Sequence, residues 1–169
     1  MTTSRVARKT GVAEPILYRH FSPKHAILCA LLEEVIARMM TAFRELIAGE
    51  TDSVAALRRV CCAYPELSHR YRREFRIINQ ALVDAKGLET REALVSQYEA
   101  YRAFLQELIE EGQRTGALRR DISATVGAWH MIHSALGFLM MQEIRRDPMS
   151  SKDLEELVDA TLGGLLEVA

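Results

Sequence analysis

Two histidines, His130 and His133, come nearest in this 169-residue sequence to a metal-binding spacing. Residues three apart are neighbours on a helix surface, so both imidazoles can reach one ion. A structural zinc site takes four protein ligands, and no carboxylate or thiol stands at a matching spacing on the same segment. A third ligand would have to come from elsewhere in the chain. We therefore predict no metal and no cofactor.

The three cysteines, Cys29, Cys61 and Cys62, are odd in number, and the two adjacent ones are poor partners for a disulfide with each other. A reduced chain is the simpler interpretation. The pair at 61 and 62 has the composition of a redox sensor, but a cysteine on a buried helix face is more often an inert small hydrophobe. The first residues also lack the apolar stretch of a signal peptide. These features predict a cytoplasmic protein.

Enzymatic chemistry leaves recognisable patterns that are missing from this sequence. We find no nucleophile paired with a base, no glycine-rich phosphate loop and no carboxylate pair in an apolar setting. The composition, 49% hydrophobic and 27% charged, is that of a folded protein. We predict a folded protein that is not an enzyme.

The charge of the chain is unevenly distributed. The net charge is −1, yet residues 1–25 contain five basic side chains and one acidic side chain. Such an excess at one end indicates contact with a polyanion, although a short window can be basic by chance.

Helical periodicity describes nearly the whole chain, and no stretch alternates as a half-buried strand does. The fold class is therefore all-α. A cap at Ser22 and Pro23 starts a long helix that ends near Gly49, and Thr51-Asp52-Ser53 caps a shorter one. Pro65 is expected to break or kink the chain, after which a new helix runs to Lys86-Gly87. The last three helices are predicted over 90–115, from Asp121 or Ser123 to Arg146, and from Ser150-x-x-Asp153 onward.

The segment from Ile122 to Gln142 contains no Asp, Glu, Lys or Arg and has the length of a membrane span. It also carries His130, His133, Ser134 and Gln142, whose polar groups would need partners in lipid. We predict a doubly buried helix and no membrane.

Residues 3–24 are typical of a helix, a tight turn and a second helix. The turn is Thr10-Gly11-Val12, where Gly11 supplies the positive φ that a three-residue turn needs. Val6, Ala7, Val12, Leu17 and Phe21 would form a small core, which leaves basic and polar faces exposed.

This segment resembles the helix-turn-helix of the tetracycline-repressor family. The matching features are Val6-Ala7, Gly11-Val12, Leu17-Tyr18-Arg19-His20-Phe21 and Lys24. Beyond residue 48 the resemblance is one of architecture only. It implies a helix-turn-helix DNA-binding segment at 1–25, followed by a helical effector-binding and dimerisation domain at 26–169.

The resemblance places Ala13 to His20 in the major groove as a recognition helix, with Glu14, Pro15 and Ile16 near base edges. Backbone phosphates would be contacted by Tyr18, His20, Lys24 and Thr3. The implied DNA-binding residues are Thr3, Ser4, Arg5, Glu14, Pro15, Ile16, Tyr18, His20 and Lys24. The alternatives are that Tyr18 and His20 only cover Phe21, and that Glu14 only favours the helix N-terminus.

One departure from the family concerns the start of the chain. Family members usually have a further helix ahead of this unit, and here Met1 directly precedes the helix that would come second. We therefore expect a DNA-binding segment that is incomplete at its N-terminus. A wrong start, a truncation and a natural shortening remain open. In a chain that is truly short, Val6, Leu17 and Phe21 lose cover and DNA affinity falls.

The resemblance also implies a mechanism in which an effector binds among the central helices, displaces the long helix and changes the spacing of two recognition helices. We expect a repressor that a small apolar or aromatic effector releases from its operator. Candidate pocket residues are Phe43, Tyr64, Phe75, Ile78, Tyr98, Tyr101, Phe104, Trp129 and His133. The alternative is a small-molecule-binding dimer of the same fold that no longer binds DNA.

The last two helices are expected to form a homodimer. The helix from about 122 combines large apolar residues with small ones such as Gly127 and Gly137, so a second helix can approach it closely on more than one side. The alternative is that both helices simply complete the core of one subunit.

Overall fold

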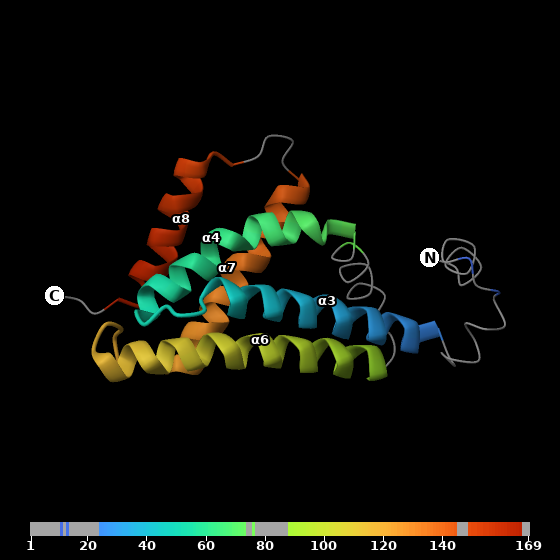
Figure 1. Cartoon of the computed structure of the whole chain (residues 1–169), viewed down its shortest axis with the longest axis horizontal. Coiled ribbons are helices and arrows are strands. Elements are labelled where there is room, and N and C mark those ends of the chain that lie inside the picture. Colours follow the sequence, from blue (N-terminus) through green and yellow to red (C-terminus); the bar gives the residue numbers. More distant parts are fainter. Residues whose placement is uncertain are drawn as a thin grey trace. The chain divides into compact units, whose positions relative to one another are not determined.

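A computed structural model describes residues 11, 13, 24–73, 76, 88–144 and 149–166. Within these residues the regular structure is helical, which confirms the all-α prediction (Figure 1). The helices are α3 (Lys24–Leu46), α4 (Ser53–Arg70), α6 (Leu88–Thr115), α7 (Ala124–Ile144) and α8 (Ser151–Gly163). A single antiparallel bridge joins Leu118 to Leu166.

The ends of these helices follow the capping residues of the sequence. Gly49 after α3 and Gly116 after α6 have φ values of +81° and +82°, a region in which glycine alone is unstrained. The Asp52 carboxylate accepts a hydrogen bond from the Val54 amide at 2.9 Å, and the Ser150 hydroxyl oxygen accepts one from the Asp153 amide at 3.1 Å. The predicted ends of α3 and α6 and the predicted starts of α4 and α8 are confirmed.

The prediction that a new helix begins after Pro65 is wrong. Helix α4 continues through Pro65 to Arg70, and Tyr71 is its C-cap. Proline removes one hydrogen bond from a helix interior, but Tyr64, Leu67 and Ser68 are all buried on either side of it. We attribute the continuity to this packing, which outweighs the local preference of proline.

The chain divides into two compact units. Unit 1 contains Met1–Ala37 and Arg73–Gln97, and unit 2 contains Arg38–Arg72 and Tyr98–Ala169. The divisions fall inside α3 and α6, so each of these helices contributes to both units. The domain boundary predicted after residue 25 stays a prediction.

The core of unit 2 is built around α4, which packs against both α7 and α8. Its most deeply buried large side chains are Phe43, Leu57, Val60, Leu105, Ile109, Leu118 and Ile132. They come from α3, α4, α6, α7 and the α6–α7 connection, so these elements share one core. At the surface, Arg58 of α4 forms an ion pair with Asp159 of α8.

The prediction that the uncharged stretch forms a doubly buried helix is wrong for a single chain, because α7 is buried on one face only. Its fully buried face includes Ala128 and Ile132, while Val126 and Met140 remain exposed. None of the described helices is both long and apolar enough to cross a membrane.

Candidate ligand-binding site

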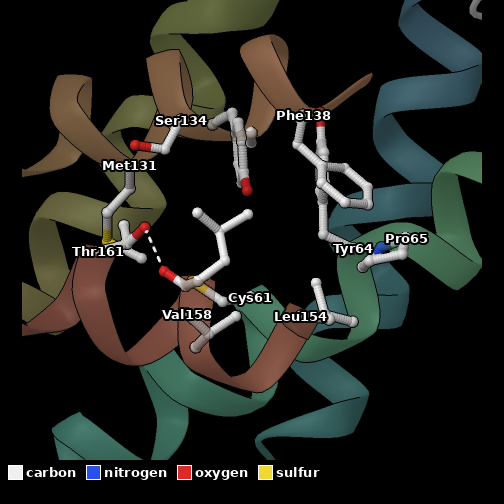
Figure 2. A pocket seen from close by; sticks show the side chains of 12 residues that line it. Cys61, Tyr64, Pro65, Met131, Ser134, Phe138, Leu154, Val158 and Thr161 are labelled. Carbon is white, nitrogen blue, oxygen red and sulfur yellow. Dashed lines mark hydrogen bonds between the residues drawn. The ribbon is translucent and has the colours of Figure 1, made fainter. Parts of the chain in front are cut away.

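Unit 2 contains a cavity of about 50 Å³ bounded by four helices (Figure 2). In this view Ser134 and Phe138 of α7 lie along its upper edge, and Leu154 and Val158 of α8 lie along its lower edge. The lining residues are Cys61, Tyr64 and Pro65 of α4, Tyr101 of α6, Met131, Ser134, Ala135 and Phe138 of α7, and Leu154, Leu157, Val158 and Thr161 of α8. None of these residues carries a charge.

Helical spacing explains why these side chains meet. On α7 the lining residues stand at positions 131, 134, 135 and 138, which is the spacing of one helix face. The α8 residues at 154, 157, 158 and 161 have the same spacing. The lining faces of α7 and α8, together with α4, enclose a pocket with mainly apolar walls.

An aromatic stack supports the Tyr101 side of the cavity. The Phe43 ring of α3, whose side chain is fully buried, stacks on the Tyr101 ring with centroids 5.8 Å apart. It also stacks on Phe104 at 6.2 Å. Offset stacking at these distances stabilises one ring orientation, so the contact with Phe43 fixes the orientation of the Tyr101 ring.

Burial keeps the acidic groups of the cavity protonated. Burial, with a smaller contribution from Cys62, raises the pKa of the Cys61 thiol from 9.0 to about 12. Burial and the nearby Tyr98 raise the pKa of Tyr64, and burial, Tyr64 and Cys61 raise the pKa of Tyr101 well above its ordinary value. The cavity is therefore a neutral site near pH 7, and its thiol is a poor nucleophile.

The two aliphatic hydroxyls of the cavity already donate their protons to the backbone. Ser134 Oγ donates to the His130 carbonyl oxygen at 2.9 Å, and Thr161 Oγ1 donates to the Leu157 carbonyl oxygen at 2.9 Å. The tyrosines differ, because no hydrogen bond joins the Tyr64 or Tyr101 hydroxyl to another described residue. No fully enclosed side-chain oxygen or nitrogen in the described residues lacks a partner, so both hydroxyls keep some open surface.

The predicted pocket residues fall into four groups. Tyr64 and Tyr101 line the cavity. Phe43 stacks on Tyr101, and Phe104 stacks on Phe43. Tyr98 lies near enough to Tyr64 to raise the pKa of Tyr64.

Trp129 and His133 do not line the cavity. Their rings stack on each other with centroids 5.7 Å apart, and His133 is exposed. Phe75 and Ile78 lie outside the described residues.

Sequence reasoning missed most of the apolar lining. The prediction followed aromatic residues, whereas Met131, Ala135 and Phe138 could have been found from their shared face on α7. Pro65 was interpreted only as a helix breaker and Cys61 only as an inert residue of the core.

Metal binding finds no support in the described part of the chain. No group of three or more His, Cys, Asp or Glu side chains there is arranged to hold an ion. His130 and His133 thus have no third ligand among these residues.

Comparison with known proteins finds similarity to one family. Residues 78–157 match the family model described as Tetracyclin repressor-like, C-terminal domain. The structure of an SmeT–triclosan complex superposes with a TM-score of 0.80 at 21% identity, covering 99% of this chain and 82% of that one. These two findings support a tetracycline-repressor-family protein.

Two further solved structures have the same fold. The ketosteroid transcriptional regulator KstR2 of Mycobacterium tuberculosis has a TM-score of 0.72 at 15% identity, covering 99% of this chain and 86% of that one. A TetR/AcrR-family transcriptional regulator from Thermobifida fusca has a TM-score of 0.69 at 17% identity, covering 97% and 86%.

Among curated proteins, the chain is similar to the nucleoid occlusion factor SlmA of Vibrio campbellii, with 25% identity over 111 residues. That alignment covers 66% of this chain and 57% of the relative. The chain thus spans little more than half the length of this curated relative.

The resemblance of residues 3–24 to a helix-turn-helix assigns DNA contact to the N-terminal segment. Most of the predicted set here lies outside the described residues: Thr3, Ser4, Arg5, Glu14, Pro15, Ile16, Tyr18 and His20. Lys24 is the first residue of α3. Gly11 is described and has a φ of +71°, which confirms the positive φ expected at the turn.

Proposed function

We propose that this protein is a ligand-responsive repressor, and that a small apolar or aromatic effector in the cavity of unit 2 releases it from its operator. The observation that carries the proposal is the neutral cavity between α4, α6, α7 and α8, with apolar walls and a few tyrosine hydroxyls. Ligand sites in proteins commonly combine these two features. The similarity of residues 78–157 to the tetracycline-repressor-like C-terminal domain supports the same function.

The size of the cavity suggests how binding is coupled to a change in shape. At about 50 Å³ it is far smaller than the roughly 300–1,000 Å³ typical of ligand pockets. An effector must therefore separate the surrounding helices, and packed helices respond by moving as rigid bodies.

Helix α6 is the element best suited to transmit that movement. It carries Tyr101 into the cavity, and its first part, up to Gln97, belongs to unit 1. A shift of α6 at Tyr101 is thus passed along one continuous helix to the unit that contains the N-terminal segment.

DNA binding is assigned to the N-terminal helix-turn-helix. In this proposal Glu14, Pro15 and Ile16 contact bases, while Tyr18, His20 and Lys24 contact phosphates. The basic excess of residues 1–25 supports the assignment.

A homodimer through α7 and α8 completes the proposal. Exposed residues of α7 lie on one face at helical spacing: Val126, His130, His133, Gly137, Met140 and Ile144. Val126, Met140 and Ile144 are 57%, 65% and 71% exposed, and Leu157 of α8 adds a further exposed apolar side chain. A second copy of the chain would bury this surface and pair two recognition helices.

Fluorescence anisotropy on the DNA upstream of the protein's own gene, at two salt concentrations, tests the DNA-binding part. We expect saturable, sequence-selective binding that weakens steeply with salt, since phosphate contacts release counterions. Lys24→Ala should weaken binding to all sequences alike, whereas Lys152→Ala, an exposed change on α8, should leave it unchanged.

A version of the chain extended upstream in frame serves as a second sample in this assay. If neither version binds any DNA selectively, the proposed function fails. The protein is then better described as a helical small-molecule-binding dimer of the same fold.

A further inference from the structure

We propose that the effector is an uncharged hydroxyl compound, an alcohol or phenol on an apolar body, held by the Tyr64 and Tyr101 hydroxyls and the Cys61 backbone carbonyl. This inference rests on the proposed role of the cavity as the effector site.

The cavity disfavours charged ligands. None of the cavity's lining residues carries a charge, and burial disfavours the charged form of every titratable group there whose pKa is shifted. An ion buried without a partner loses its hydration and gains no opposite charge in return. A carboxylate or ammonium ligand is therefore strongly disfavoured.

The tyrosine hydroxyls are the hydrogen-bond donors that the cavity offers to a ligand. Tyr64 is only 6% exposed, and its hydroxyl makes no hydrogen bond to another described residue. The Tyr101 hydroxyl likewise has no such partner, and both groups stay protonated near pH 7. Because Ser134 and Thr161 already donate to the backbone, the tyrosines are the hydroxyl donors left for a ligand.

The hydrogen-bond acceptor in this proposal is the backbone carbonyl of Cys61. In a regular helix the carbonyl of residue 61 accepts from the amide of residue 65, but Pro65 has no N–H. Helix α4 continues past this position, so the Cys61 carbonyl lacks its ordinary helical donor. Cys61 and Pro65 both line the cavity, and they appear on either side of Tyr64 in Figure 2. The ligand can supply the missing donor.

One hydroxyl group satisfies both requirements. Its oxygen accepts from a tyrosine hydroxyl, and its proton is donated to the Cys61 carbonyl. An ether can only accept, and a carboxylate can only accept and is charged. The apolar wall formed by Met131, Phe138 and Val158 takes the remaining body of the molecule.

Three matched probes test this selectivity by isothermal titration calorimetry with the full chain: 4-ethylphenol, 4-ethylanisole and 4-ethylbenzoate. We expect 4-ethylphenol to bind about fivefold to tenfold more tightly than 4-ethylanisole, the usual effect of one hydrogen bond. We expect no binding of 4-ethylbenzoate. Absence of 4-ethylphenol binding at millimolar concentration, or equal binding of the benzoate, would overturn the inference.

Two variants assign the selectivity to named groups. Pro65→Ala restores the N–H that pairs with the Cys61 carbonyl, so it should reduce the ratio of phenol affinity to anisole affinity severalfold. Alanine favours helix, so this variant is expected to fold. Tyr64→Phe keeps the ring and removes the donor, and should weaken both ligands. Tyr71→Phe, at the C-cap of α4 and outside the cavity lining, is the matched control and should change neither.

The calorimetric result does not depend on DNA, so the two proposals can fail separately. Selective phenol binding by a chain that binds no DNA supports the inference and contradicts the proposed function. Selective DNA binding by a chain that ignores 4-ethylphenol supports the proposed DNA-binding role and overturns the inference.

Discussion

Cys61 shows how burial decides the chemistry of a single residue in this protein. An exposed thiol next to Arg58 would be activated by the positive charge, but burial outweighs that effect and raises the pKa of Cys61 to about 12. The same cause keeps Tyr64 and Tyr101 protonated. The side chains of α4 that line the cavity therefore act as neutral binding groups, and a thiolate redox sensor at Cys61 is disfavoured.

The raised pKa of Cys61 predicts a loss of stability at high pH. The folded state retains this proton more tightly than the unfolded state, so the contribution is complete below pH 9 and is lost between about pH 9 and 12. Each pH unit in that window should reduce the free energy of unfolding by up to about 1.4 kcal/mol. Urea unfolding at pH 8 and pH 10 should show a smaller decrease for Cys61→Ala than for the unchanged protein. Equal decreases in the two proteins would contradict this assignment.

At the residue scale, the sequence predicted the two tyrosines of the candidate site and missed Phe138, the aliphatic lining and the other polar groups. Tyr64 and Tyr101 were included because aromatic side chains suit an apolar ligand, and both line the cavity. The role of Pro65 was not predictable, because it depends on α4 staying helical past a proline. Trp129 was included on its type alone, but it faces away from the face of α7 that lines the cavity.

At the scale of elements, capping signals were more informative than the proline. Gly49, Gly116, Asp52 and Ser150 act locally, so their effect can be predicted from the sequence. The continuation of α4 through Pro65 depends on contacts with α7 and α8, which are distant in sequence. Long-range packing therefore decided the helix that, within the described residues, the sequence predicted wrongly.

The junction between α4 and α6 depends on a glycine that lacks room for a side chain. A Cβ at Gly112 would lie 2.6 Å from Leu118 Cδ1 and 2.8 Å from Ser53 Oγ. Both Leu118 and Ser53 are buried, so neither can move away easily. This close approach fixes the end of α6 against the start of α4.

Gly112→Ala should therefore destabilise the protein by about 1–3 kcal/mol, the usual effect of overpacking a core. Gly163→Ala is the matched control, because a Cβ there meets nothing within 4 Å in the last turn of α8. Urea denaturation of both variants gives the comparison. A Gly112→Ala protein as stable as the control would show that the junction adjusts without loss.

For the whole molecule, the distribution of exposed apolar side chains points to a surface that is incomplete in one subunit. Val126, Met140 and Ile144 share one face of α7, and a single chain leaves all three exposed. The sequence indicated this helix as a dimer element from its mixture of large and small residues, and that assignment stays a prediction.

Val126→Arg should dissociate the proposed dimer, because an unpaired charge in an apolar interface costs several kcal/mol. Val95→Arg is the matched control, since Val95 is 56% exposed and Val126 is 57% exposed, and Val95 lies on α6. Sedimentation velocity should show monomers for the first variant and dimers for the second. Dimers in both variants would exclude this face of α7 as the dimer interface. Monomers in both would show that the effect is not specific to this face.

In the proposed mechanism, occupation of the cavity controls DNA binding. The most direct measurement is the affinity for operator DNA with and without saturating 4-ethylphenol, in the unchanged protein and in Ala135→Phe, whose new ring would fill the cavity. We predict at least a fivefold loss of DNA affinity on adding the phenol to the unchanged protein, within the usual range of allosteric coupling. The variant should bind DNA without responding to the phenol. The same phenol response in both proteins, or none in either, would contradict the claim.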